Sequence, residues 1–216
     1  LAVDEMLQPA ADLLHHLGAG LFVDEGLDLR LEIVACEGWR RSQTWDETGL
    51  VWTNPSPNMR RLSAALLYPG IGLLETTNLS VGRGTDTPFE VLGAPWIEPQ
   101  PFAAMLNDLE LPGVRAVPRR FTPNASKYAG ELCGGVDLVI TDFNRVEPVR
   151  IGITVAHALR KLYPDNWQTD RLSRLLVSRQ VEEAIVSGAP PSEIKPLTEV
   201  GLDEFKRRRA AALIYR

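Results

Sequence analysis

Two long stretches of this sequence, 45–58 and 75–96, lack any sustained hydrophobic period. Both are crowded with Pro, Gly, Asn and aromatic residues, so neither is typical of a helix or a strand. Segments of this length without regular structure are usually either functional or disordered. Their content of Trp and Phe argues against disorder. We therefore expect two functional loops held on a core that the rest of the chain builds.

The remaining sequence alternates between helical and extended patterns of apolar residues. The spacing predicts helices over 3–17, 59–67, 101–109, 151–162, 170–187 and 202–214, with another turn at 70–74. Strands are predicted over 27–35, 90–92, 114–121 and 136–141. A chain of 216 residues can bury a core as one domain. These elements predict a single α/β (mixed α+β) domain over 1–216, with a mixed sheet and flanking helices.

Composition argues against several classes of function. The net charge of −5 disfavours a binder of duplex nucleic acid, and a solvated helix face explains the basic run at 206–209. No apolar stretch approaches the roughly 20 residues needed to span a membrane. The histidines are scattered, and no common nucleotide-binding, protease or esterase motif is present. We expect no metal and no organic cofactor.

The two cysteines bear on the redox state of the chain, and the first residue bears on what precedes it. Cys36 and Cys133 lie far apart, without the CxxC spacing of a zinc or redox site. They are interpreted either as buried free thiols or, in an exported protein, as a disulfide. The chain begins with Leu1 rather than Met, so we expect that a signal peptide or a whole domain has been removed upstream.

Carboxyl groups in the irregular stretches are the first candidates for chemistry. Glycoside hydrolysis normally needs two of them, one acting as an acid and the other as a base or nucleophile. Glu75 is the strongest candidate because it follows the apolar run GIGLL. The alternative is a structural carboxylate that caps the next turn. The other candidates are Asp46, Glu47 and Asp142.

Arg83 lies in a glycine-punctuated segment that also holds Asn78, Ser80 and Thr85. Gly in this pattern permits tight turns, so the segment could wrap a polar ligand, and the guanidinium of Arg83 suits a carboxylate. A structural role in bracing the loop is the alternative. Indole rings could stack on a sugar or fill the core beneath the loops, and the candidates are Trp39, Trp45, Trp52 and Trp96.

Three ordered blocks of sequence resemble the exo-β-N-acetylmuramidase family typified by NamZ, once catalogued as a family of unknown function. They are GWRRSQTWDETGLVWTNPSPNM, ALLYPGIGLLETTNLSVGRGTDTPFEVLGAPW and RFTPNASKYAGELCGGVDLVITD. The resemblance runs in order over about 3–215. It implies a glycosidase that releases N-acetylmuramic acid (MurNAc) from the non-reducing ends of peptidoglycan, located in the bacterial cell envelope or secreted.

The resemblance also implies how the chain takes part. In this family an N-terminal Rossmann-like domain precedes a C-terminal α/β domain, and the cleft between them is thought to receive MurNAc. This chain is similar to the second domain, and the Pro-Glu-His-Gly type motif of the family's proposed catalytic Glu is not found. The matching cleft positions, with Glu75 as the catalytic candidate, are Trp52, Pro55, Ser56, Asn58, Tyr68, Glu75, Asn78, Ser80, Arg83, Thr85, Phe89 and Trp96.

Two hypotheses about function follow. In the first, the chain supplies the C-terminal side of the substrate cleft of a peptidoglycan hydrolase, whose N-terminal domain is its partner. In the second, it is a non-catalytic module that binds cell-wall sugar or a partner. Thr76 and Val81 stand where family members often carry Gly and Glu, and the loss of that acidic side chain favours the second hypothesis.

Overall fold

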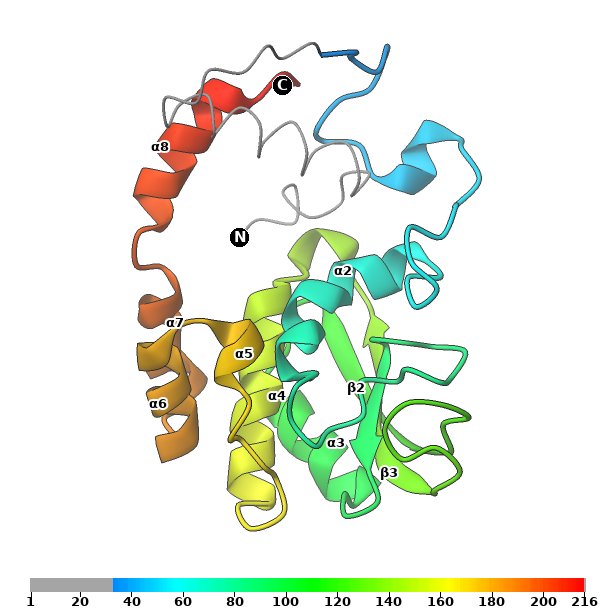
Figure 1. Cartoon of the computed structure of the whole chain (residues 1–216), viewed down its shortest axis with the longest axis vertical. Helices are drawn as coiled ribbons and strands as arrows, with labels where there is room; N and C mark the ends of the chain where they lie inside the picture. The colour runs from blue at the N-terminus through cyan, green and yellow to red at the C-terminus, as the bar shows by residue number, and fades with distance from the viewer. Residues whose placement is uncertain (1–32, 216) are drawn as a thin grey trace.

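The computed structural model describes residues 33–215 of the chain (Figure 1). The elements in chain order are η2 (Trp45–Thr48), α2 (Leu62–Ile71), η3 (Gly72–Leu74), β1 (Val91–Ala94), α3 (Pro99–Asp108), β2 (Val114–Phe121), β3 (Cys133–Ile140), η4 (Phe143–Arg145), α4 (Pro148–Leu162), α5 (Ser173–Leu176), α6 (Arg179–Ser187), α7 (Pro191–Thr198) and α8 (Leu202–Ala212). The mixed α+β class is confirmed. The predicted strand at 114–121 has the same bounds as β2.

The three strands form one sheet in the order β1-β3-β2. β2 and β3 pair antiparallel from Val114↔Ile140 to Phe121↔Cys133, and β1 pairs antiparallel with the other edge of β3. β2 and β3 follow one another with no helix between them, and such strands pair antiparallel because a parallel pairing needs a long crossover. Both strand pairings in the described part of the chain are antiparallel, and the predicted mixture of strand directions is not seen there.

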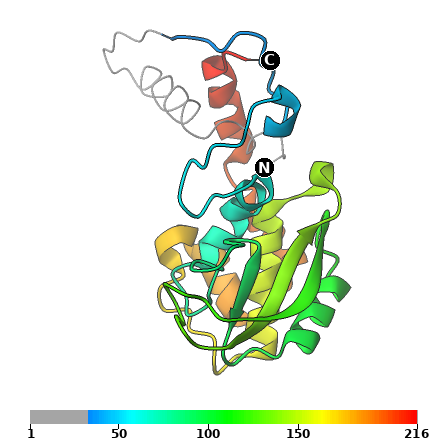
Figure 2. The same ribbon diagram turned by 90° about the vertical axis from the view of Figure 1, so that its right-hand side faces the viewer.

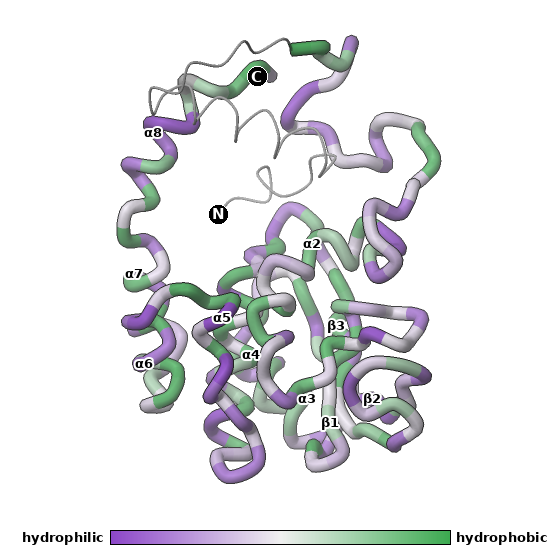
Figure 3. The backbone as a smooth tube through the Cα atoms, in the orientation of Figure 1, coloured by the Kyte–Doolittle hydropathy of each residue, from purple (hydrophilic) through white to green (hydrophobic). Residues whose placement is uncertain are grey.

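The packed helices α2, α3 and α4 lie on one face of this sheet, whereas α8 extends away from it (Figure 2). α3 packs against β2 and β3, and α2 packs against α4. Apolar side chains between these layers, such as Phe102, Leu106, Val136 and Leu159, are fully buried. Burial of this kind is the main favourable contribution to folding. Figure 3 shows the apolar residues along the strands and the packed helices, whereas α8 is mostly hydrophilic.

Two glycines allow α2 and α4 to approach closely. A Cβ atom on Gly70 would lie 1.7 Å from the carbonyl oxygen of Pro148, and one on Gly152 would lie 2.3 Å from the carbonyl oxygen of Gly70. Both overlaps are with backbone atoms, so no side chain larger than hydrogen fits at either position. This contact fixes the end of α2, which continues through η3 into the turn that carries Glu75.

The second half of the chain differs from the sequence prediction in two places. The helix predicted over 170–187 is two helices, α5 and α6, because Val177 between them adopts a left-handed backbone conformation with φ of 58°. The helix α7 was not predicted, since its sequence contains Pro191 and Pro196. Pro191 is the first residue of the helix, where its missing N–H is not needed.

The two ends of the described chain meet away from the sheet, beyond α8 (Figure 1). The backbone N–H of Cys36 donates to Oη of Tyr215 at 2.6 Å, and the rings of Trp39 and Tyr215 pack edge to face with centroids 4.7 Å apart. The predicted helix over 3–17 and most of the predicted strand over 27–35 lie outside the described residues. Residues 33–35 have no regular structure.

The two cysteines differ in burial, and their reactivity tests the packing of the core. Both are free thiols; Cys36 is exposed and Cys133 is buried, and burial raises the pKa of the Cys133 thiol to about 11. Because thiolate is the reactive form, we expect iodoacetamide at about pH 8 to alkylate Cys36 in the folded protein and Cys133 only after unfolding. Mass spectrometry of proteolytic fragments measures both. Equal alkylation of the two thiols under native conditions would contradict the buried position of Cys133.

Candidate functional site

The turn after η3 and the glycine-punctuated loop at 82–85 place Glu75 beside Arg83. Gly82 and Gly84 adopt φ values of 80° and 83°, which glycine tolerates without strain. Nε of Arg83 forms an ion pair with Oε1 of Glu75, and the guanidinium lies 5.6 Å from the centroid of the Phe89 ring. Their side chains are 38% and 27% exposed, respectively. The pair is therefore accessible from solvent.

A second loop, 122–132, packs against the first. A Cβ atom on Gly84 would lie 2.2 Å from the carbonyl oxygen of Ala125, and the backbone N–H of Asn124 donates to the carbonyl oxygen of Gly84 at 2.8 Å. This close approach carries Lys127 to the turn, where its Nζ donates to the backbone carbonyl oxygen of Glu75 at 2.5 Å. Glu75, Arg83 and Lys127 together are called the charged cluster below.

Burial lowers the pKa of Lys127. Loss of solvent around its ammonium lowers its pKa, the neighbouring Glu75 carboxylate raises it, and the Arg83 guanidinium lowers it further. Sequence reasoning did not select Lys127 as a site residue, although it lies inside one of the three blocks that resemble the family. The signal available in the sequence was a polar, glycine-containing connection between two predicted strands, which is a common position for functional residues.

Asn78 lies in the same irregular stretch as Glu75 and Arg83, and both polar atoms of its side chain have hydrogen-bond partners. Its Nδ2 donates to the carbonyl oxygen of Asn166 at 2.8 Å, and its Oδ1 accepts from the backbone N–H of Gln168 at 2.9 Å. Its own carbonyl oxygen accepts a hydrogen bond from Oη of Tyr128 at 2.6 Å. Asn78 therefore joins three segments of chain and braces them, and its contact with a ligand stays a prediction.

This role of Asn78 predicts a loss of stability on substitution. Asn78→Ala removes both side-chain hydrogen bonds and leaves a carbonyl and an N–H without their partner, which is expected to lower the free energy of unfolding by about 1–3 kcal/mol. Urea denaturation of the purified variant measures this. Asn166→Ala is the matched control, because it keeps the carbonyl oxygen that Asn78 uses. Equal stability of the two variants would argue against the bracing role.

Ser80 and Thr85 also hold the scaffold. Ser80 is only 2% exposed, and its backbone exchanges hydrogen bonds with Gly93 at 2.9 and 3.0 Å. Oγ1 of Thr85 donates to the carbonyl oxygen of Gly82 at 2.7 Å and accepts from the backbone N–H of Thr87 at 3.1 Å. These contacts close the loop that presents Arg83.

The aromatic candidates Tyr68 and Trp96 differ in their distance from the charged cluster. Tyr68 packs edge to face on Phe89 with ring centroids 4.9 Å apart, which places it beside the ring that underlies Arg83. Its side chain is partly exposed, so a sugar could reach it. Trp96 packs edge to face on Tyr163 at 5.3 Å and lies against the core. Tyr68 is thus better placed than Trp96 for contact with a ligand.

Trp52, Ser56 and Asn58 lie on a different segment, 49–60, and no contact of their side chains with the charged cluster is found among the described residues. Nε1 of Trp52 donates to the carbonyl oxygen of Met59 at 3.1 Å, and its ring packs on Trp45 at 5.9 Å. The structure therefore separates the twelve motif positions into two groups. Ligand contact by all of them would require that both groups face one cleft.

The end of that segment is attached to the Arg83 loop by charge pairs. NH1 of Arg60 lies 3.2 Å from Oδ1 of Asp86, and NH2 of Arg61 donates to the carbonyl oxygen of Asp86 at 3.3 Å. Nε of Arg61 lies 3.4 Å from Oε2 of Glu90, whose Oε1 accepts from Oγ of Ser63 at 2.5 Å. The entry to α2 and the loop that presents Arg83 are thus held together.

Two of the other carboxyl candidates, Glu47 and Asp142, have local structural roles. Oε2 of Glu47 accepts from the backbone N–H of Thr44 at 2.6 Å, and this hydrogen bond is the main cause of a lowered pKa for Glu47. Oδ1 of Asp142 accepts from the backbone N–H of Asn144 at 3.0 Å, which caps η4. Residues 33–215 contain no group of three His, Cys, Asp or Glu side chains placed to hold a metal ion.

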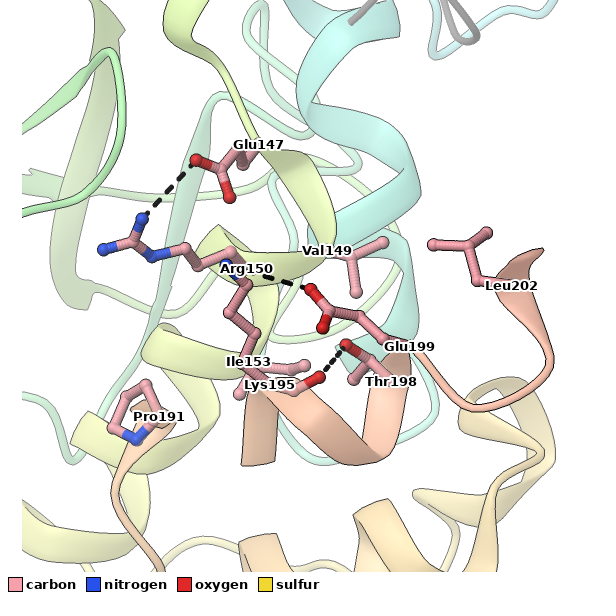
Figure 4. A pocket seen from close by; sticks show the side chains of 9 residues that line it. All are labelled: Glu147, Val149, Arg150, Ile153, Pro191, Lys195, Thr198, Glu199 and Leu202. Carbon is pink, nitrogen blue, oxygen red and sulfur yellow. Dashed lines mark hydrogen bonds and ion pairs between the residues drawn. The ribbon is translucent and has the colours of Figure 1, made fainter. Parts of the chain in front are cut away.

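A cavity of about 100 Å³ lies elsewhere, between α4, α7 and the start of α8 (Figure 4). Polar and apolar side chains line it together: Glu147, Arg150, Lys195, Thr198 and Glu199 with Val149, Ile153, Pro191 and Leu202. Ligand pockets usually measure about 300–1,000 Å³. This cavity is too small for a sugar, so the charged cluster remains the candidate site.

Comparison with known proteins connects this arrangement to a family. Residues 66–215 match the family model described as "Exo-beta-N-acetylmuramidase NamZ, C-terminal", and residues 17–63 match the model of the N-terminal part of the same protein. The chain belongs to the NamZ family. The Glu75 turn, the Arg83 loop and Lys127 all fall in the C-terminal match, whereas Trp52, Ser56 and Asn58 fall in the N-terminal match.

Individual relatives agree with the family models. The peptidoglycan beta-N-acetylmuramidase NamZ of Bacillus subtilis (strain 168) is 37% identical over 201 residues, which cover 91% of this chain and 49% of that protein. Two crystal structures of DUF1343 family proteins from Bacteroides fragilis have TM-scores of 0.78 and 0.69, at 27% and 24% identity. They cover 93% and 94% of this chain, which covers 55% of each. The chain thus spans about half the length of these relatives.

No helix in the described part of the chain is long and apolar enough to cross a membrane.

Proposed function

We propose that this chain contributes the C-terminal side of the substrate cleft of an exo-β-N-acetylmuramidase, which releases MurNAc from the non-reducing end of peptidoglycan fragments. The observation that carries the proposal is the charged cluster, a solvent-accessible carboxylate with two cations, built from the segments that match the C-terminal family model. The name of the Bacillus subtilis relative supports the substrate class.

In this proposal, the two domains of the family each supply one catalytic carboxyl group. Residues 66–215 form the C-terminal domain, and residues 17–63 belong with the N-terminal one, in keeping with the two family models. Hydrolysis of a glycosidic bond needs two carboxyl groups. The cluster supplies one of them in Glu75, and the family's N-terminal domain supplies the other. Tyr68 stands beside the cluster as a surface for the sugar ring.

Hydrolysis of a chromogenic β-MurNAc glycoside tests this function. The 216-residue chain and the full product of its gene are assayed side by side, with a β-N-acetylglucosaminide of the same leaving group as the specificity control. We expect turnover of the MurNAc glycoside by the full gene product. Lack of turnover by that protein would count against the enzyme.

A binding module is the second candidate, and one observation favours it. The charged cluster contains a single carboxylate, fewer than the two that glycoside hydrolysis requires. A module of this kind would bind MurNAc-containing glycans with no turnover in either form of the protein. Calorimetry with a soluble muropeptide distinguishes it from a protein that does not interact with peptidoglycan.

A further inference from the structure

The charged cluster carries an excess of positive charge. One carboxylate, Glu75, faces two cations, Arg83 and Lys127, so the net charge of the three side chains is +1. Arg83 contacts Glu75 through Nε. Its two terminal nitrogens donate no hydrogen bond to another described residue, so they can donate to a ligand. The hydrogen bond of Lys127 is to a backbone carbonyl oxygen and not to a carboxylate. A single negative charge would neutralise the cluster.

The position of Lys127 is imposed by its loop at a conformational cost. Its two neighbours, Ser126 and Tyr128, adopt left-handed backbone conformations with φ of 67° and 57°. Such conformations cost about 1 kcal/mol or more for residues other than glycine, and they gather at functional sites. The hydrogen bonds of Asn124 to the Arg83 loop and of Tyr128 to Asn78 hold this loop in place. The fold therefore directs an ammonium group to this point.

Partial burial adds a second reason to expect an anionic ligand. The ammonium of Lys127 is removed from part of its solvent, and this desolvation is the main cause of its lowered pKa. A partly desolvated cation binds an anion more strongly than an exposed one, because the attraction is less screened. Lysine suits a carboxylate that approaches as a point charge, and the free edge of the Arg83 guanidinium offers further donors to the same group.

We propose that Lys127, together with Arg83, binds the lactyl carboxylate of N-acetylmuramic acid and thereby selects this acidic sugar over neutral amino sugars. MurNAc differs from N-acetylglucosamine by a lactyl ether that carries one carboxylate, which matches the charge that the cluster lacks. This inference rests on the proposed function and assigns Lys127 as its specificity-determining residue. Glu75 then remains available to face the glycosidic bond.

Isothermal titration of the full gene product with two sugars tests the assignment. The probes are the methyl β-glycoside of MurNAc and the same glycoside with the lactyl group converted to its carboxamide, which keeps the shape and removes the charge. We expect the wild-type protein to bind the acid about tenfold or more tightly than the amide. Lys127→Met is expected to bind both sugars alike, and Lys127→Arg is expected to retain the preference.

Lys161→Met is the control, because Lys161 is exposed at the end of α4, away from the cluster. Equal affinity of the wild type for acid and amide would overturn the assignment while leaving sugar binding intact. An equal loss of both affinities in Lys127→Met would show that Lys127 only braces the loop. If the wild type binds neither sugar, the proposed function fails together with the assignment. The wild-type comparison decides even if Lys127→Met does not fold.

Discussion

Replacing Glu75 by Gln is expected to lower kcat for a chromogenic β-MurNAc glycoside by about 100-fold or more in the full gene product. The amide keeps the shape of the side chain but removes the negative charge that pairs with Arg83. A neutral amide cannot act as a base, a nucleophile or a stabiliser of positive charge at the sugar. Steady-state kinetics of the variant measure the change, and thermal unfolding shows whether its fold is intact.

Glu98→Gln is the matched control for Glu75. Glu98 is also a surface carboxylate paired with an arginine, because its Oε2 lies 3.8 Å from NH2 of Arg120. It is not part of the charged cluster, so the same chemical change is expected to leave kcat unaltered. A Glu75→Gln protein that retains activity within a few-fold of wild type would remove Glu75 from the catalytic candidates. A loss of activity that accompanies unfolding would assign it a structural role.

Gly70→Ala is expected to cause the largest loss of stability, at least about 3 kcal/mol of unfolding free energy. The added methyl group would lie 1.7 Å from the carbonyl oxygen of Pro148, so α2 and α4 would have to separate along a fully buried contact. Urea denaturation measures the change. Because α2 leads into the turn that carries Glu75, we expect a fall in activity as well.

Gly72→Ala controls for the effect of any methyl group at this end of α2. Gly72 has helical dihedral angles, and the nearest atoms that a Cβ atom there would meet belong to the ring of Tyr68, the first at 3.2 Å. A side-chain ring can move by the few tenths of an ångström required. We therefore expect a change within about 1 kcal/mol. A similar loss in both variants would mean that the α2–α4 contact is not what limits stability.

The extent to which sequence predicted this fold depended on how local each signal was. The alternation in 114–121 and the helical spacing in 151–162 depend on neighbouring residues alone, and both elements form with nearly those bounds. The break at Val177 is different. It places α6 against α4 and α7, and no residue near Val177 signals that packing. No element was predicted over 191–198, where two prolines lie within α7.

In the candidate site, too, residues that depend on local sequence were predicted and those that depend on distant contacts were not. Glu75 and Arg83 were selected from sequence and do form a pair, because both lie in one short irregular stretch. Asn78 looked equally suited to a ligand, but its amide binds the backbone of residues 166 and 168, about 90 positions away. Lys127 was missed for the converse reason. Its role depends on a loop that meets the Glu75 turn only in three dimensions.

The ion pairs of Arg60 and Arg61 with Asp86 and Glu90 determine where a fragment of this protein should begin. The two family models meet between residues 63 and 66, which would ordinarily mark a place to cut the gene. Both arginines lie on the N-terminal side of that junction, and their partners lie on the other side, in the segment that presents Arg83. A fragment that starts at residue 66 would leave the carboxylates without these cations. A fragment that keeps both ion pairs must therefore begin before Arg60, so the boundary between the two family models is not where these contacts end.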